Sequence, residues 1–139
     1  ISVRLFAIRM TGIFNQTGAY NTLLQLLEHP IQQVRKETIK TLKRFLLPES
    51  CAILRQQYKS ETRENKLEIV RALTQIPDES NKEFLIEIFK AGDYHFKIEA
   101  AKGLHQIFHE PEQSLFKELP IKNQQDKQII RHILDPGIV

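Results

Sequence analysis

The chain has 139 residues, 41% of them apolar and 27% charged, which fits a single domain with its own core and excludes a disordered or membrane-spanning chain. Twenty Lys and Arg against 17 Asp and Glu give a net charge of +3, which excludes a long acidic or basic tail. The single cysteine, Cys51, excludes a disulfide framework and a multi-cysteine zinc site, and it permits a reducing compartment.

Apolar residues recur with helical spacing along the chain, and the strict alternation typical of strands is scarce. The pattern predicts an all-α fold. Helices are expected at residues 1–14, 19–28, 31–46, 50–59, 62–76, 80–90, 94–109, 112–119 and 125–134. Thr62 and Asp93 are predicted to be the N-caps of the helices that follow them, and Ser80 with Glu83 has the spacing of a capping box.

These helices form pairs, and the second helix of each pair repeats with a period of 31 residues. The repeating columns are Val3, Val34, Asn65, Phe96; Ala7, Thr38, Ile69, Ala100; Ile8, Ile39, Val70, Ala101; Thr11, Leu42, Leu73, Leu104; and Phe14, Phe45, Ile76, Ile107. All but Thr11, Thr38 and Asn65 are apolar, and together they trace one face of a helix. The first helices share the period at Leu23, Leu54, Leu85 and Phe116.

The period also predicts the domain organisation. We expect one domain over 1–139, in which 1–16 is the second helix of a truncated repeat, 17–47, 48–78 and 79–109 are full repeats, and 110–139 is a terminal capping repeat. Because the sequence opens at Ile1 inside a periodic segment and without Met, we expect it to be a piece of a longer protein. A membrane anchor or catalytic domain, if that protein has one, lies outside these residues.

A valine followed by a basic residue opens the second helix of the first two units, at Val3-Arg4 and Val34-Arg35, with small or β-branched residues four positions on. Paired helices of this length and pattern resemble HEAT repeats, and most closely the short variety first described in phycobilisome lyase proteins. The resemblance implies a right-handed α-solenoid of about four helical hairpins. It also implies protein binding as the commonest function of the family, with no catalytic residue.

The position after the valine column is always basic, at Arg4, Arg35, Lys66 and Lys97, which we call the inner basic positions. Their stems are expected to pack inward and their charged ends to reach the neighbouring turn. In the family, an acidic residue in the preceding turn often accepts this charge. Asp93 fits that role, but Ile31 and Thr62 occupy the equivalent positions. We therefore expect an incomplete series, or one that uses backbone carbonyl groups.

A second basic column, the outer basic positions, comprises Arg9, Lys40, Arg71 and Lys102 on the opposite, exposed side of the second helices. Two interpretations are open. Glutamates stand three residues before the last three of these positions and can form ordinary i, i+3 ion pairs, which is the commoner use of such a pattern. The alternative is a stripe of charge that contacts a partner.

The exposed sides of the second helices are the predicted partner-binding surface. Its candidate residues are Arg9, Lys40, Lys43, Arg44, Arg71, Gln75, Lys102, His105 and Gln106. Residues 1–47 hold seven basic and two acidic side chains, so an acidic protein or peptide is one expected partner. No aromatic residue interleaves this basic segment and the chain has no Trp, which disfavours nucleic acid. No apolar run approaches the roughly 18 residues of a membrane-spanning helix.

Catalytic and metal chemistry find little support. His105 and His109 have i, i+4 spacing but lack the adjacent Glu and the third ligand of a zinc protease, and Cys51 has no base beside it in sequence. We therefore expect no metal, no cofactor and no catalytic residue. The predicted function is a non-catalytic protein-interaction or scaffold module of a larger protein, expected in the cytoplasm. The alternatives are an enzyme-associated, lyase-like subunit, or a binder of anionic surfaces, nucleic acid or lipid, through the basic amino-terminal third.

Overall fold

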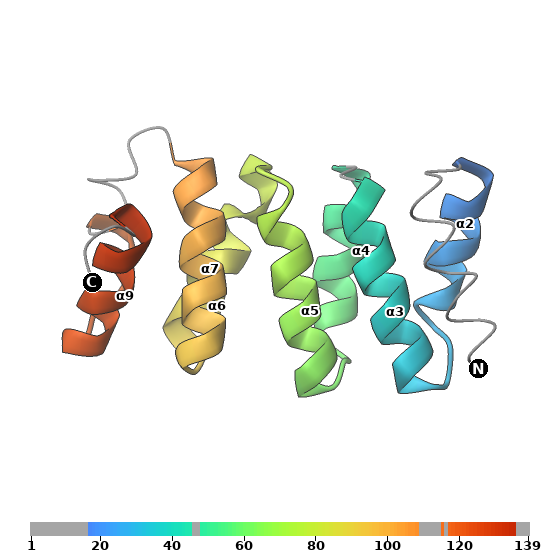
Figure 1. Ribbon diagram of the computed structural model, residues 1–139, viewed down its shortest axis with the longest axis horizontal. Coiled ribbons are helices and arrows are strands. Elements are labelled where there is room, and N and C mark those ends of the chain that lie inside the picture. The colour runs from blue at the N-terminus through green and yellow to red at the C-terminus, as the bar shows by residue number, and fades with distance from the viewer. Residues whose placement is uncertain (1–16, 46–47, 109–114, 116, 136–139) are drawn as a thin grey trace. The chain divides into compact units, whose positions relative to one another are not determined.

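The computed structural model describes residues 17–45, 48–108, 115 and 117–135, and the regular elements in these residues are helices (Figure 1). The all-α prediction is thereby confirmed for this part of the chain. The predicted helix at 1–14 and half of the one at 112–119 lie outside the described residues. By its internal contacts the chain divides into two compact units, Ile1–Gln75 and Ile76–Val139, each of which is treated separately below.

The first unit contains two helical hairpins. Its elements are α2 (Thr17–Leu26), α3 (Gln32–Leu42) with a 3₁₀ turn η1 (Lys43–Phe45), α4 (Glu49–Tyr58) and α5 (Arg63–Thr74). Helix α3 packs against both α2 and α5, and α4 packs against α5. Figure 1 shows α3 and α5 side by side, with α4 behind them. A 2.8 Å hydrogen bond between the hydroxyl groups of Tyr20 and Ser50 links the first helices α2 and α4.

The second unit contains the 3₁₀ turn η2 (Glu79–Asn81), α6 (Lys82–Ala91), α7 (Tyr94–Ile107) and α9 (Gln124–Leu134). Helix α7 packs against α6 on one side and α9 on the other. No described helix of either unit is long and apolar enough to cross a lipid bilayer.

Helix starts follow the predicted capping chemistry in two cases and depart from it in one. The Thr62 hydroxyl accepts a hydrogen bond from the backbone N–H of Asn65, and the Asp93 carboxylate accepts one from Phe96, both at 3.3 Å. The predicted capping box at Ser80 is wrong. Asp78 instead accepts the Ser80 N–H at 2.8 Å, so a 3₁₀ turn forms first and α6 starts afterwards.

The columns spaced by 31 residues are the core. Every member of the second-helix columns whose side chain the structure describes is buried, including Thr38 and Asn65, which are polar. Leu23, Leu54 and Leu85 of the first helices are at most 1% exposed. Thr38 is accommodated because its hydroxyl donates to the Val34 carbonyl within the same helix, at 2.7 Å.

Gly92 joins α6 to α7 through a close approach. A Cβ atom placed there would lie 2.7 Å from the Ile88 carbonyl oxygen and 2.7 Å from Cβ of Phe96. Its backbone is extended (φ −81°, ψ 166°), so glycine is required by space and not by a left-handed conformation. The absence of a side chain at Gly92 therefore allows a tight connection between α6 and α7.

Candidate interaction surface

The inner basic position Arg35 joins three segments of the first unit. Its guanidinium donates to the carbonyl oxygens of His29 at 2.8 Å and Pro30 at 3.2 Å, in the turn before α3. It also forms a two-pronged ion pair with Glu61, with Nε–Oε2 and Nη2–Oε1 distances of 2.9 and 3.3 Å. The predicted backbone acceptors are present. The acidic partner belongs to the next hairpin, in the turn before α5, and not to the preceding turn.

Glu61 is the centre of a buried polar cluster. Its side chain is 1% exposed and accepts hydrogen bonds from Arg35, from the Gln57 amide at 2.9 Å, and from the Thr62 N–H and Asn65 amide at 3.1 Å each. Burial alone would raise the pKa of this carboxyl, but the hydrogen bonds from Arg35, Gln57 and Thr62 outweigh it and hold the pKa below the ordinary value of 4.5. Glu61 is thus a structural anion whose carboxylate is already bound by groups of the fold.

The other described inner basic positions also point into the fold. Lys97 pairs at 2.8 Å with Asp126, whose side chain is 0% exposed, and its ammonium lies 5.4 Å from the ring centre of Phe89. The expectation that Asp93 would accept Lys97 is wrong, because Asp93 caps α7. Lys66 lies 5.2 Å from the ring centre of Tyr58. Arg35 and Lys97 therefore link segments of successive repeats, whereas Lys66 packs within its own hairpin.

The outer basic positions divide into paired and unpaired residues. Arg71 pairs with Glu68 at 3.1 Å and Lys102 with Glu99 at 3.5 Å, each at i, i+3 as the ion-pair interpretation predicts. Lys40 has no such pair, and Glu37, three residues before it, is buried. Arg9 lies outside the described residues.

Lys40 has two basic neighbours, Lys43 and Arg44, and we call these three residues the α3 basic cluster. Lys40 and Arg44 are exposed, and Lys43 is half-buried. None of the three forms an ion pair with another residue in the described ranges. Lys36, one turn earlier on the same face, is occupied by Glu64, whose hydrogen bond raises the pKa of the Lys36 ammonium.

The structure distributes the predicted surface residues over both units. In the first unit, Arg71 of α5 and Gln75 just after it stand at the positions equivalent to Lys40 of α3 and Arg44 of η1, and α3 and α5 pack together. In the second unit, α7 carries exposed Lys102 and Gln106, with His105 half-buried between them.

The residues considered for other chemistry have ordinary surroundings. Cys51 is 1% exposed in the core of the first unit. His105 lies on α7, and its predicted companion His109 is outside the described residues. Among the residues that the structure describes, no group of three or more His, Cys, Asp or Glu side chains could hold a metal ion.

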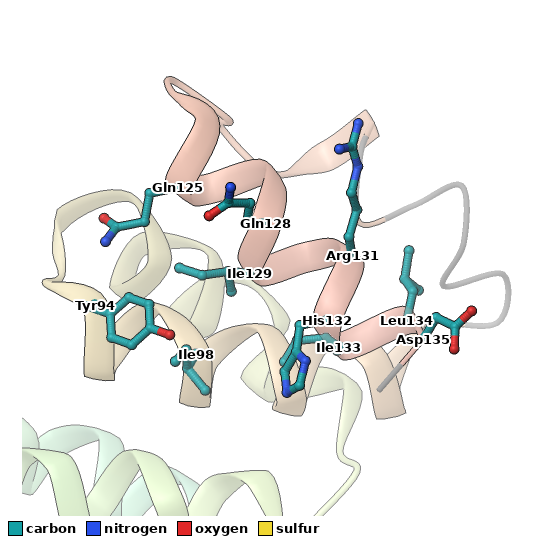
Figure 2. A pocket seen from close by; sticks show the side chains of 10 residues that line it. All are labelled: Tyr94, Ile98, Gln125, Gln128, Ile129, Arg131, His132, Ile133, Leu134 and Asp135. Carbon is teal, nitrogen blue, oxygen red and sulfur yellow. The ribbon is translucent and has the colours of Figure 1, made fainter. Parts of the chain in front are cut away.

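An open groove of about 810 Å³ lies between α7 and α9 of the second unit (Figure 2). Tyr94 and Ile98 of α7 project toward α9, where Ile129 lies opposite them. Tyr94 is 47% exposed, which is high for a large aromatic residue. The remaining lining residues, all from α9 and its carboxyl end, are Gln125, Gln128, Arg131, His132, Ile133, Leu134 and Asp135.

The sequence did not predict this groove, although one signal points to it. Ile98 stands 31 residues after Leu67 and 62 after Lys36, at a position outside the buried columns. An isoleucine there indicates apolar surface on α7. Whether α9 covers or frames that surface depends on packing between helices, which the spacing within one helix does not reveal.

Comparison with known proteins agrees with these hairpins. A search of curated proteins found no match to the chain. Residues 1–65 match the family model described as HEAT repeats, a region that includes α2, α3 and α4. This match and the all-helical hairpins support a HEAT-repeat assignment for residues 1–65.

Proposed function

We propose that this chain is a non-catalytic protein-interaction module that binds a protein or peptide along the exposed sides of α3, α5 and α7. HEAT repeats generally mediate interactions between proteins, which is the general support. The observation that carries the proposal is the α3 basic cluster, whose three cations have no ion-pair partner among the described residues.

The two sides of these helices differ in their contacts, and this difference supports the same function. Their column residues are buried in the core, and the inner basic positions Arg35 and Lys97 form ion pairs with Glu61 and Asp126. The outer sides carry charged and amide residues that the fold does not need. A repeat array that presents such residues from successive helices offers an extended surface for a partner.

The finer architectural expectations belong to this proposal. We infer a right-handed superhelix of about four hairpins with a 31-residue period, made of repeats 17–47, 48–78 and 79–109 between the truncated unit 1–16 and the capping unit 110–139. Small-angle scattering tests the elongation of this superhelix, because a compact chain of this length has a radius of gyration of about 14 Å and a superhelix has a larger one. The buried thiol of Cys51 agrees with a reducing compartment, and we propose that the protein is cytoplasmic.

Site-specific photo-crosslinking tests the binding surface. A photoreactive amino acid at exposed Gln75 of the α5 end or Gln106 of α7 is expected to capture a common partner in cells. The same group at exposed Gln56 of α4 or Glu87 of α6 serves as the matched control on a first helix. Capture from the first helices alone, or from none of the four positions, would contradict the proposal.

A further inference from the structure

We propose that the α3 basic cluster, with the adjoining side of α5, binds an acidic segment of a partner protein. This inference rests on the proposed function and specifies the partner's chemistry. Lys40, Lys43 and Arg44 stand at intervals of three and one along the chain, so they project from one side of α3 and its 3₁₀ extension.

The positive charge of this cluster is not neutralised by its own surroundings. Residues 1–47 contain two acidic side chains, Glu28 and Glu37, and Glu37 is 4% exposed in the core. On the neighbouring helix α5, Glu64 is already bound by Lys36 and Gln32, and Glu68 is bound by Arg71. A concentration of uncompensated cations attracts an anionic partner over roughly 8 to 10 Å at physiological salt.

The neighbouring helix adds groups that suit carboxylates. Arg71 on α5 is 43% exposed although it pairs with Glu68, and Gln75 beyond it is exposed with an amide that can donate a hydrogen bond. Arg44 can bind a carboxylate with two parallel hydrogen bonds, whereas the lysines act as point charges. A segment with several Asp or Glu residues would therefore meet cations from two adjacent helices of the first unit.

The character of this surface favours a protein segment over nucleic acid or a membrane. Among the described residues, the large apolar side chains that are exposed are Ile31, Ile53 and Tyr94, and none belongs to the cluster. Binding of single-stranded nucleic acid uses aromatic side chains on which bases stack. Membrane-surface binding adds an apolar face that enters the acyl chains. Among the described residues, the cluster and the adjoining side of α5 offer charged and amide groups.

Fluorescence anisotropy with the whole chain tests the inference. The probe is a fluorescein-labelled peptide of alternating Glu and Ser, and a Gln-Ser peptide is the neutral reference. The triple variant Lys40→Glu, Lys43→Glu and Arg44→Glu is expected to weaken binding of the acidic probe by about tenfold or more at low salt. Exposed Lys59, Lys90 and Lys127, changed together to Glu, provide a control with an equal change in net charge and an expected effect below about threefold.

Circular dichroism should give the same helical content for both triple variants, because the changed residues make no ion pair with the described part of the chain. Equal weakening by both variants would overturn the inference, since binding would then follow net charge alone. It would also be overturned if the acidic probe bound no better than the neutral one.

Two further probes identify the wrong class of partner. The first is a thymidine oligonucleotide and the second is phosphatidylserine vesicles. The inference would be overturned if either bound more tightly than the acidic peptide and if that binding were lost in the cluster variant but kept in the control. The partner would then be a nucleic acid or a membrane. If the acidic peptide does not bind the unmodified protein, a partner can still be captured by crosslinking from Gln75 and Gln106. Failure of this inference is therefore distinguishable from failure of the proposed function.

Discussion

Asn65 and Gln32 exchange two hydrogen bonds between α5 and α3. The Gln32 amide donates to Oδ1 of Asn65 at 2.8 Å, and the Asn65 amide donates to the Gln32 carbonyl oxygen at 3.3 Å and to Glu61 at 3.1 Å. Asn65 is fully buried in a column that holds Val34 and Phe96 at equivalent positions. A polar residue is stable there because its amide has partners on both sides.

Replacing Asn65 by Ala is expected to lower the free energy of unfolding by about 1 to 3 kcal/mol, because Gln32 and Glu61 each lose a buried partner. Urea titration monitored by circular dichroism measures the change. Gln33→Ala, at an exposed position on α3 beside Gln32, should shift stability by less than about 0.5 kcal/mol. Equal effects of the two substitutions would show that the exchange contributes nothing.

Acid should destabilise the first unit through Glu61. The native state holds the pKa of this carboxyl below its ordinary value, so its contribution to stability is present above the unfolded pKa near 4.5 and is lost as pH falls through the native pKa. The Glu61→Gln variant should be less stable at pH 7 and lose less stability between about pH 5 and about pH 2. Parallel pH profiles for the two proteins would refute this role.

The buried, hydrogen-bonded ion pair of Lys97 and Asp126 is expected to stabilise the second unit. Burial disfavours the charged carboxylate of Asp126, but hydrogen bonds from Lys97 and the Lys122 N–H outweigh this and lower its pKa. Lys97→Met leaves that buried charge without its cation and should lower stability by about 3 kcal/mol. Adding Asp126→Asn should restore part of the loss. The more exposed pair of Lys102 and Glu99 serves as the comparison, and Lys102→Met is expected to change stability by about 0 to 1 kcal/mol.

The leucine column provides a test of the core. Leu42, Leu73 and Leu104 are at most 1% exposed, and changing each to Ala should cost about 2 to 5 kcal/mol by removing buried methyl groups and leaving a cavity. Denaturant unfolding of the three variants measures the loss. Ile53→Ala, at a 36% exposed position on α4, should cost clearly less. Three values near zero would contradict the columns as the core.

The Cys51 thiol should report on opening of the first unit. Because it is 1% exposed, a disulfide-exchange reagent should react with it at least about a hundredfold more slowly in the native protein than in denaturant. A Cys51→Ser protein with Ala52→Cys, one residue along at an exposed position, should react rapidly. Equal native rates for the two thiols would be incompatible with the described packing.

Much of the fold could be predicted because it depends on spacing along one helix. Apolar periodicity located α3, α5 and α7, and short-range capping chemistry identified Thr62 and Asp93. The Ser80 prediction failed because Asp78 accepts the Ser80 N–H, which a capping box would donate to Glu83. Sequence spacing alone does not rank two such acceptors.

The candidate site could be predicted less completely, since its pairings join distant hairpins. Arg35 and Lys97 find their acids 26 and 29 residues later in the chain, at unequal separations that a fixed period does not reveal. The i, i+3 pairs of Arg71 and Lys102 were predictable, but the lack of one at Lys40 was not.

The link from Arg35 to Glu61 also bears on how the first unit folds. In repeat proteins, cooperativity depends on the ratio between the stability of one repeat and the coupling to its neighbour. Here the cation on α3 lacks its carboxylate until the turn before α5 is in place, and Glu61 in turn gathers Gln57 and Asn65. Much of the coupling is thus concentrated at one boundary. The hairpins on either side of it should fold and unfold together, without a populated state in which only one is formed.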